Sequence, residues 1–272
     1  MQTYFIYLRV IKVGLALLCT ATALATESDF VWDNSLRQHY FGNKVISLDD
    51  SVISLEAPKR ADNAAIVPIR IRAGFAQSPK RYIKTVTVLV DQNPVPLAGK
   101  FHFFPESGQA DLALRIRVNT YTNVRAVAET NDGQLYLSKQ FVKASGGCSA
   151  PMSTDLEEAL TRLGKMNIKL LHQELKSSPV PVQLNIRHPN LSGLSMDQLT
   201  QLYLPAHFVK KLRVTYNDQP VLIAETDISI SEDPSFRFYI QPQGEGTLKA
   251  EFTDSKDMSF ETLTKMEMDS SS

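Results

Sequence analysis

The stretch LALRIRV, residues 112–118, alternates apolar and other side chains with a period of two. Its leucines, isoleucine and valine share one face, and its alanine and two arginines lie on the opposite face. Successive side chains of a β-strand point to opposite sides of the sheet, whereas a helix repeats every three to four residues. The stretch therefore predicts a strand with one buried face.

The same alternation recurs on both sides of this stretch. Strands are predicted at 67–72 and 86–90 before it, and at 124–128 and 135–141 after it. Residues 131–133, Asn-Asp-Gly, are a turn signal between the last two strands. Since no helical period separates these short strands, they predict an antiparallel sandwich of the immunoglobulin class.

A second β-rich unit is predicted from about residue 182 to residue 260. Alternation predicts strands within it at 212–216, 221–226, 236–240 and 248–252. The predicted fold class is therefore all-β, with two immunoglobulin-like antiparallel β-sandwich domains. The end of the chain is polar, and residues 263–272 are predicted to form a flexible tail.

Small residues occupy the junction between the two units. The run ASGGCSA at 144–150 is followed by Pro151. Thr154 and Glu157 fit a capping box, and three leucines follow at helical spacing, which predicts a short helix. We expect a Gly-Gly-Cys arm and this helix to join the sandwiches over residues 145–180.

The N-terminus has the features of a signal peptide over residues 1–25. Arg9 and Lys12 precede an uncharged run, and Ala23-Leu24-Ala25 fits a cleavage site. The alternative is an uncleaved membrane anchor, but the uncharged run is shorter than the ~20 residues that a spanning helix needs. We expect an exported, periplasmic protein that begins at Thr26 and has no membrane segment after cleavage.

Cleavage would also remove Cys19 and leave Cys148 as the single thiol of the mature chain. Gly146 and Gly147 lack Cβ atoms and would give the arm backbone freedom. We therefore expect an exposed, reactive cysteine, whose pKa the following helix could lower. The alternatives are a buried, inert thiol and an intermolecular disulfide that links a homodimer.

Both units resemble subunits of the periplasmic sulfur-oxidation carrier. The first resembles SoxY and the second resembles SoxZ, and together they look like the fused SoxYZ-like carriers linked with quinoprotein dehydrogenases. The resemblance assigns residues 26–144 to a SoxY-like sandwich and residues 181–262 to a SoxZ-like sandwich. The matching stretches lie at 54–58, 67–69, 91–97 and 142–148 for SoxY, and at 186–189, 205–208 and 227–234 for SoxZ.

The resemblance implies a carrier without catalytic activity or cofactor, which bears sulfur intermediates covalently on Cys148. It implies periplasmic partners: sulfur-oxidation enzymes, cytochromes or a quinoprotein dehydrogenase. One departure is that Ser149-Ala150 follows the cysteine where the family arm has Gly-Gly and ends. An arm tethered at both ends sweeps less space. The alternative function is a non-covalent accessory module that docks on a quinoprotein dehydrogenase or a cytochrome.

Other function classes lack support in the sequence. The 29 basic residues are balanced by 29 acidic ones without a basic cluster, so nucleic acid is not an expected partner. No Gly-x-Ser-x-Gly elbow or phosphate loop is present, and a thiol redox enzyme would need a second cysteine. The five histidines show no paired spacing, so no metal is expected. His188 and His207 are expected to shape loops, and Asn93 to Pro96 to form a rigid turn beside the arm.

Overall fold

A computed structural model describes residues 29–171, 179–198 and 200–266. The predicted signal peptide, residues 1–25, lies outside the described residues, as do residues 267–272. The chain divides into two units, 1–43 and 44–272. No helix among the described residues is long and apolar enough to cross a membrane.

The described part of the first unit is helical. A π-helical turn, η1 (Trp32–Leu36), continues into α3 (Arg37–Phe41), and the Trp32 and Phe41 ring centroids lie 5.9 Å apart. These residues were predicted to belong to the first sandwich, but they are helical. The apolar positions of this short segment are too few to distinguish one helical turn from a loop.

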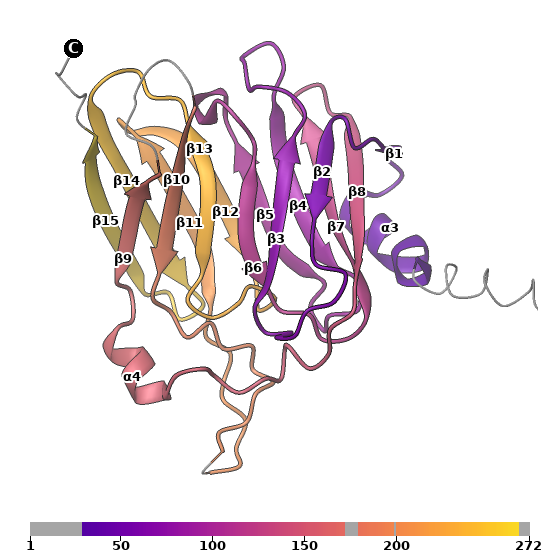
Figure 1. Cartoon of the computed structure of the whole chain (residues 1–272), viewed down its shortest axis with the longest axis vertical. Helices are drawn as coiled ribbons and strands as arrows, with labels where there is room; N and C mark the ends of the chain where they lie inside the picture. The colour runs from indigo at the N-terminus through magenta and orange to yellow at the C-terminus, as the bar shows by residue number, and fades with distance from the viewer. Residues whose placement is uncertain (1–28, 172–178, 199, 267–272) are drawn as a thin grey trace, which may run out of the picture. The chain divides into compact units, whose positions relative to one another are not determined.

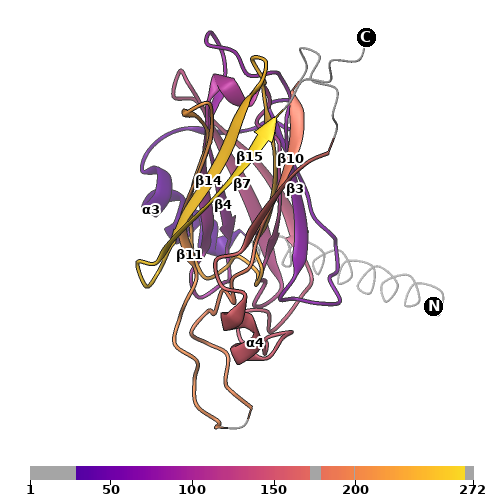
Figure 2. The same cartoon turned by 90° about the vertical axis from the view of Figure 1, so that its left-hand side faces the viewer.

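The second unit consists of two sheets that lie face to face (Figures 1 and 2). One sheet has the strand order β1-β8-β7-β4-β5-β12-β11-β14-β15, and the other has the order β2-β3-β6-β13-β10-β9. Neighbouring strands are antiparallel except β1 and β8, which are parallel. The strands are β1 (Ile46–Leu48), β2 (Ile53–Glu56), β3 (Val67–Ala73), β4 (Ile83–Val90), β5 (Leu97–Phe103), β6 (Leu112–Ile116), β7 (Thr122–Thr130), β8 (Leu135–Val142), β9 (Met166–Leu170), β10 (Val180–Ile186), β11 (Val209–Tyr216), β12 (Gln219–Thr226), β13 (Ser235–Ile240), β14 (Gly246–Asp254) and β15 (Ser259–Met266).

The burial of side chains follows the alternation in the sequence. In β3, Val67, Ile69 and Ile71 are buried and the residues between them are exposed. In β6 the leucines and Ile116 point into the core. The predicted all-β sandwich class is confirmed, because a period of two leaves one apolar face that only a second sheet can cover.

Both sheets run continuously through the SoxY-like and SoxZ-like halves. Strand β5 of the first half pairs with β12 of the second, and β6 pairs with β13. The side chains between the sheets form one hydrophobic cluster from both halves, in which the Phe101 and Phe236 ring centroids are 6.1 Å apart. The two predicted sandwiches are therefore two halves of one sandwich, because the strand edges of each half satisfy those of the other.

Three details of the connection and the C-terminus differ from the prediction. Strand β9 pairs with β10, so strands of the second half begin at residue 166 rather than 181. Helix α4 (Leu156–Thr161) is capped by Asp155, whose carboxylate accepts from two backbone N–H groups, instead of by Thr154. Strand β15 continues to Met266 through its pairing with β14, so residues 263–266 are not a flexible tail.

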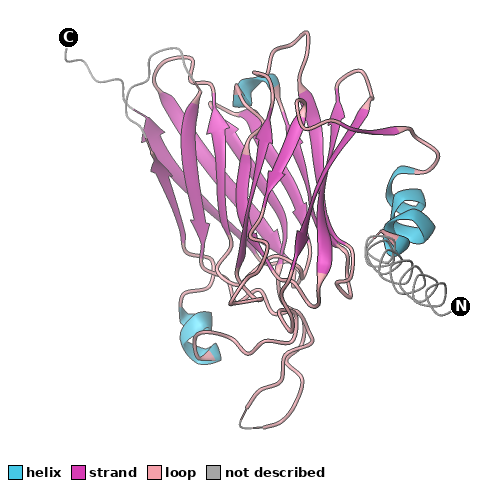
Figure 3. Ribbon diagram, turned by 45° about the vertical axis from the view of Figure 1, so that its right-hand side comes forward, coloured by secondary structure: helices cyan, strands magenta, loops and turns pink. Residues whose placement is uncertain are grey.

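A long irregular loop, residues 187–208, connects β10 and β11. It projects from the same end of the sandwich as α4, at the bottom of Figures 1 and 3. At its base Leu191 forms a bridge with His207, and the base packs under the end of β6. A short 3-10 turn, η2 (Pro105–Ser107), lies between β5 and β6.

Candidate functional site

Cys148 lies inside the protein, with 0% of its surface exposed. The arm, residues 145–150, is docked against the chain that leaves β6. The N–H of Gly146 donates to the carbonyl of Asn119 at 2.8 Å, and that of Gly147 donates to the carbonyl of Val118 at 3.0 Å. The prediction of an exposed cysteine was wrong, because the arm is hydrogen-bonded to residues 118 and 119, far from it in the sequence.

The two arm glycines allow this docking. A Cβ on Gly147 would lie 2.1 Å from the carbonyl oxygen of Ala64 and 2.6 Å from that of Val118. Gly146 has a φ of +82°, a backbone conformation that glycine adopts without strain. Both glycines were predicted to give the arm its flexibility. In this conformation Gly147 is needed because three backbone segments meet there.

Arg117 holds the arm from the side of β6. One terminal nitrogen of its guanidinium donates to the carbonyl of Gly147 at 3.2 Å, and the other donates to the carbonyl of Asn190 at 3.1 Å. The residue is 3% exposed, and its Nε has no hydrogen-bond partner among the described residues. Arg117 therefore connects the arm to both halves of the protein.

The start of the projecting loop closes the site from the SoxZ-like half. The hydroxyl of Ser192 donates to the carbonyl of Cys148 at 2.5 Å. Asn190 is fully buried, and its side chain donates to the carbonyl of Ile230 and accepts from the N–H of Val209. These bonds fix the backbone that presents Asn190 and Ser192 to the arm.

The predicted turn at Asn93 lies beneath the site. The Asn93 amide donates to the carbonyl of Arg117 and to the hydroxyl of Ser229, both at 2.8 Å. Its carbonyl oxygen accepts from the N–H of Asn119 at 2.8 Å. Asn93 thus holds the backbone of Arg117 in place, and from there the guanidinium reaches the arm.

The surroundings oppose ionisation of the thiol. Burial raises the pKa of Cys148 to about 11, while the positive charge of Arg117 lowers it in part. Burial also lowers the pKa of Arg117, against the opposing effects of Glu232 and of Cys148 itself. The expected lowering of the thiol pKa was wrong: with the arm docked, the thiol is protonated at neutral pH.

His188, His207 and Asp254 form a second buried cluster, in which one potential ligand atom from each lies within 4.8 Å of the others. His207 Nε2 is 2.8 Å from Asp254 Oδ2. Nδ1 of His188 accepts from the N–H of Asn190 at 3.0 Å, so its Nε2 carries the proton and faces Asp254 at 3.5 Å. A metal on this Nε2 would require the opposite tautomer. The arrangement favours a hydrogen-bonded cluster that supports the loop.

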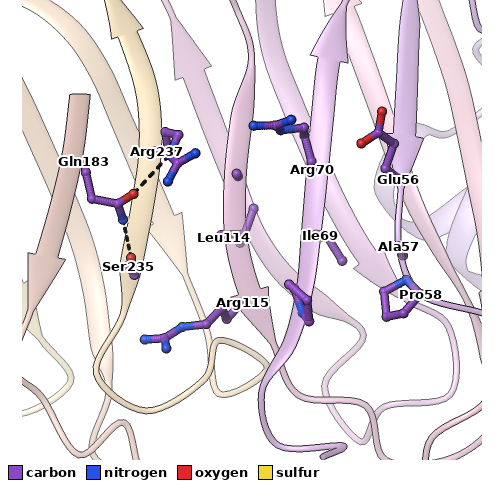
Figure 4. Close-up of a pocket in the computed structure, with 12 residues that line it drawn as sticks. Glu56, Ala57, Pro58, Ile69, Arg70, Leu114, Arg115, Gln183, Ser235 and Arg237 are labelled. Atoms are coloured by element: carbon purple, nitrogen blue, oxygen red, sulfur yellow. Dashed lines mark hydrogen bonds between the residues drawn. The ribbon is translucent and has the colours of Figure 1, made fainter. Parts of the chain in front are cut away.

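A groove of about 470 Å³ crosses the outer face of the six-stranded sheet (Figure 4). Its walls come from both halves and carry Arg70, Arg115 and Arg237 against a single acidic residue, Glu56. The guanidinium of Arg237 donates to Gln183, which fixes one side of the groove. The groove presents a net positive surface.

Sequence reasoning named Cys148 but missed Arg117, Asn190 and Ser192. Arg117 has the pattern of any arginine on the outer face of a strand, and the SoxZ-like segments around His188 suggested only a loop. The asparagine and serine that follow His188-Pro189 were the one available signal. His102 is on β5, and His39 belongs to the first unit, on α3.

Comparison with known proteins identifies both halves. The family model described as "Sulfur oxidation protein SoxY" matches residues 37–148, and its match ends on Cys148. The model described as "Sulphur oxidation protein SoxZ" matches residues 168–265. A search of curated proteins gave no match.

Solved structures give only distant similarity. The superoxide reductase (neelaredoxin) from Ignicoccus hospitalis is 15% identical, with 34% of this chain and 79% of that chain covered and a TM-score of 0.31. A β-glycosidase from Bacteroides vulgatus is 8% identical, with 79% of this chain and 24% of that chain covered and a TM-score of 0.23. Such scores carry no argument about function.

The continuous sandwich, with one family in each half, defines a protein of the sulfur-oxidation carrier class. The chain belongs to the SoxY and SoxZ families and is a fused SoxY–SoxZ-type protein. Members of these families act with sulfur-oxidation enzymes as carrier or accessory proteins rather than as catalysts.

Proposed function

We propose that this protein carries sulfur intermediates covalently on Cys148 and presents them to partner enzymes. The observation that carries the proposal is the SoxY match, which ends on Cys148, the one cysteine among the described residues. The site around the thiol is built by both halves, as expected if SoxY and SoxZ act together. The docked arm is then a closed state that protects the thiol or its adduct from solvent.

Presentation to a partner requires the arm to undock. Undocking breaks four hydrogen bonds: those from the N–H groups of Gly146 and Gly147, from Arg117 to Gly147 and from Ser192 to Cys148. At about 0.5–1.5 kcal/mol net for each bond, the cost is about 2–6 kcal/mol. The open state would then be populated at about one molecule in 30 to about one in 3 × 10⁴. Such an equilibrium permits slow reaction without a permanently exposed thiol.

Tetrathionate tests covalent loading and is itself the oxidant in the reaction. The Cys148 thiolate attacks an inner sulfur, a new S–S bond forms, the central S–S bond of tetrathionate breaks, and thiosulfate leaves. We expect the native protein to gain one adduct by intact mass, and a reductant to remove it. Cys148→Ala is the control, chosen over serine because a buried hydroxyl would need a new partner. A thiol that reacts only after denaturation would contradict the proposal.

The second candidate is a non-covalent accessory module. Two observations favour it: the burial of Cys148 and the open arginine-lined groove across both halves, which suits an acidic partner surface. The intact mass of protein purified from its source without reductant distinguishes the carrier from the accessory module. A sulfur adduct on Cys148 supports the carrier, and a bare thiol in every preparation supports the module.

The proposed compartment is the periplasm, and cytochromes or a quinoprotein dehydrogenase are proposed partners beside the sulfur-oxidation enzymes. The support for export is the signal-like N-terminal sequence. N-terminal sequencing of the native protein is expected to begin near Thr26. Recovery of a chain that still carries Met1 in the cytoplasm would overturn this part of the proposal.

A further inference from the structure

Two arginines are fully or almost fully buried in the sandwich, and their surroundings differ. Arg125 is neutralised by Asp91, with its Nε 2.8 Å from one carboxylate oxygen and a terminal nitrogen 2.7 Å from the same atom. Arg117 has only two backbone carbonyls as hydrogen-bond partners, and no carboxylate among the described residues lies within ion-pair distance of it. Its Nε is buried without a partner.

A buried cation without a counter-ion is costly, and carbonyl dipoles offset only part of that cost. The acidic group that acts on Arg117 is Glu232, which raises its pKa. The carboxylate of Glu232 is itself bonded to the N–H and the hydroxyl of Ser153, in the segment after the arm. The Arg117 site is therefore electrostatically incomplete and would gain from an anion close to the guanidinium.

An anionic group carried by Cys148 would lie close to Arg117. Arg117 donates to the carbonyl of Gly147, the residue directly before the cysteine, and the Cys148 and Arg117 side chains influence each other's charge. A guanidinium binds an oxyanion through parallel N–H groups, and its Nε–H is free to take part.

We propose that Arg117 is the counter-ion of the Cys148 site and binds the anionic end of the sulfur adduct when the arm is docked. This inference rests on the proposed carrier function and deepens it. The site is selective for adducts that end in a sulfonate or another anionic sulfur group, and it disfavours neutral adducts of similar size. Arg117 is a positioning residue: it holds both the arm backbone and the charge of the cargo.

The test compares an anionic and a neutral adduct on the same thiol. Tetrathionate supplies the anionic adduct, and methyl methanethiosulfonate supplies a neutral methyl disulfide. In the unsubstituted protein, the thermal midpoint of the anionic form is expected to exceed that of the neutral form by about 3 °C or more, as a charge-assisted hydrogen bond would give in a domain of this size. Protein that does not react while native is loaded in denaturant and refolded.

The variants separate the charge of Arg117 from its structural contacts. In Arg117→Gln the difference in thermal midpoint between the two adduct forms is expected to disappear, whatever the overall stability of the variant. Arg117→Lys keeps the charge without the planar fork and is expected to keep part of the difference. The matched control is Arg115→Gln, two residues earlier in the chain, whose guanidinium donates to the carbonyl of Asp233. Arg115→Gln should leave the difference in thermal midpoint between the two adduct forms unchanged.

Two outcomes distinguish the two proposals from each other. If both adducts form but their midpoints differ equally in the unsubstituted protein and in Arg117→Gln, the inference about Arg117 is overturned and the carrier function stands. If the native thiol takes no sulfur adduct, the carrier function fails. In that case the thermal midpoints of the two adduct forms, loaded in denaturant and refolded, still report whether Arg117 favours an anionic adduct.

Discussion

At the scale of single residues, the environment of Cys148 determines its chemistry. A lone cysteine between glycine and serine has no apolar neighbours in the sequence and was expected at the surface. In the structure Cys148 is buried, and its arm is held by backbone of Ala64 and Val118 at Gly147, by Arg117 at the Gly147 carbonyl and by Ser192 at the Cys148 carbonyl. Burial keeps the thiol protonated, so its reactivity depends on leaving the site rather than on a lowered pKa.

The buried His188 predicts that the protein loses stability in mild acid. Burial lowers the pKa of His188 to about 4, with a further lowering by His207, from an ordinary value of 6.5. Between these two values the unfolded chain binds a proton that the folded protein does not. The free energy of unfolding should therefore fall as the pH decreases from about 6.5 towards about 4, by up to about 1.4 kcal/mol per pH unit.

Urea unfolding at pH 7, 6 and 5 measures this effect. His188→Asn is the informative variant, because asparagine keeps an acceptor for the N–H of Asn190 but does not titrate in this range. We expect the pH dependence of the variant to be smaller than that of the unsubstituted protein over this interval. Equal slopes in the two proteins would mean that the folded protein binds the proton of His188 as readily as the unfolded chain does.

At the scale of elements, the arm is a docked segment rather than a free one. Its backbone pairs with residues 118 and 119, and Ser153, further along, is bound to Glu232. Helix α4 then leads into β9, so the arm is held on both sides by structured chain. Because it is tethered at both ends, the arm exposes Cys148 only by peeling away from β6 and the loop base.

The substitution Gly147→Ala predicts an arm that docks poorly. The new Cβ would lie 2.1 Å from the carbonyl oxygen of Ala64, which belongs to backbone and cannot rotate away. We expect native alkylation of Cys148 to become about tenfold faster or more, with a loss of stability of about 1–3 kcal/mol. Iodoacetamide labelling followed by mass spectrometry provides the rate.

The matched control for this variant is Gly133→Ala. Gly133 has a φ of +84°, whereas the φ of Gly147 is not in the positive region; nothing lies within 4 Å of the Gly133 Cβ position, which is in a turn between β7 and β8. This variant reports the cost of backbone strain alone and should leave the labelling rate unchanged. Equal labelling rates for Gly147→Ala and the unsubstituted protein would mean that the arm is not held at Gly147 in solution.

At the scale of the whole molecule, the two halves are joined by strand pairing within the 44–272 unit. Both sheets cross the boundary, through β5–β12 and β6–β13, and one apolar core fills the space between them. The Cys148 site is also built from both halves, since Arg117 comes from the SoxY-like half and Asn190 from the SoxZ-like half.

Separate expression of the halves tests this dependence. Chains of residues 29–150 and 151–272 would each expose two strand edges and part of the apolar core. We expect each alone to be poorly soluble, and the two together to purify as a stable complex with Cys148 protected. Halves that are both soluble and show no affinity for each other would contradict the single-sandwich architecture.

The class of fold and the family follow from the amino-acid sequence alone. Period-two alternation reports which side chains share a face, so the strands around residues 67–72 and 112–118 followed from local pattern alone. Short motifs such as those ending at Cys148 were sufficient to indicate SoxY and SoxZ. Where local pattern was weak, as at β9 and in the helix before residue 43, the prediction failed.

The burial and the charge of the candidate site become visible only in the folded chain. The groups that hold the arm at Gly147 and Cys148 come from residues 64, 117–118 and 192, and local sequence pattern does not report contacts between segments so far apart. Arg117 likewise follows the alternation of an outward-facing strand residue, yet the loop base and the arm cover it completely. Burial and electrostatics arise from the sum of these distant contacts. The charge of the site and the access to its thiol therefore depend on how the chain is folded.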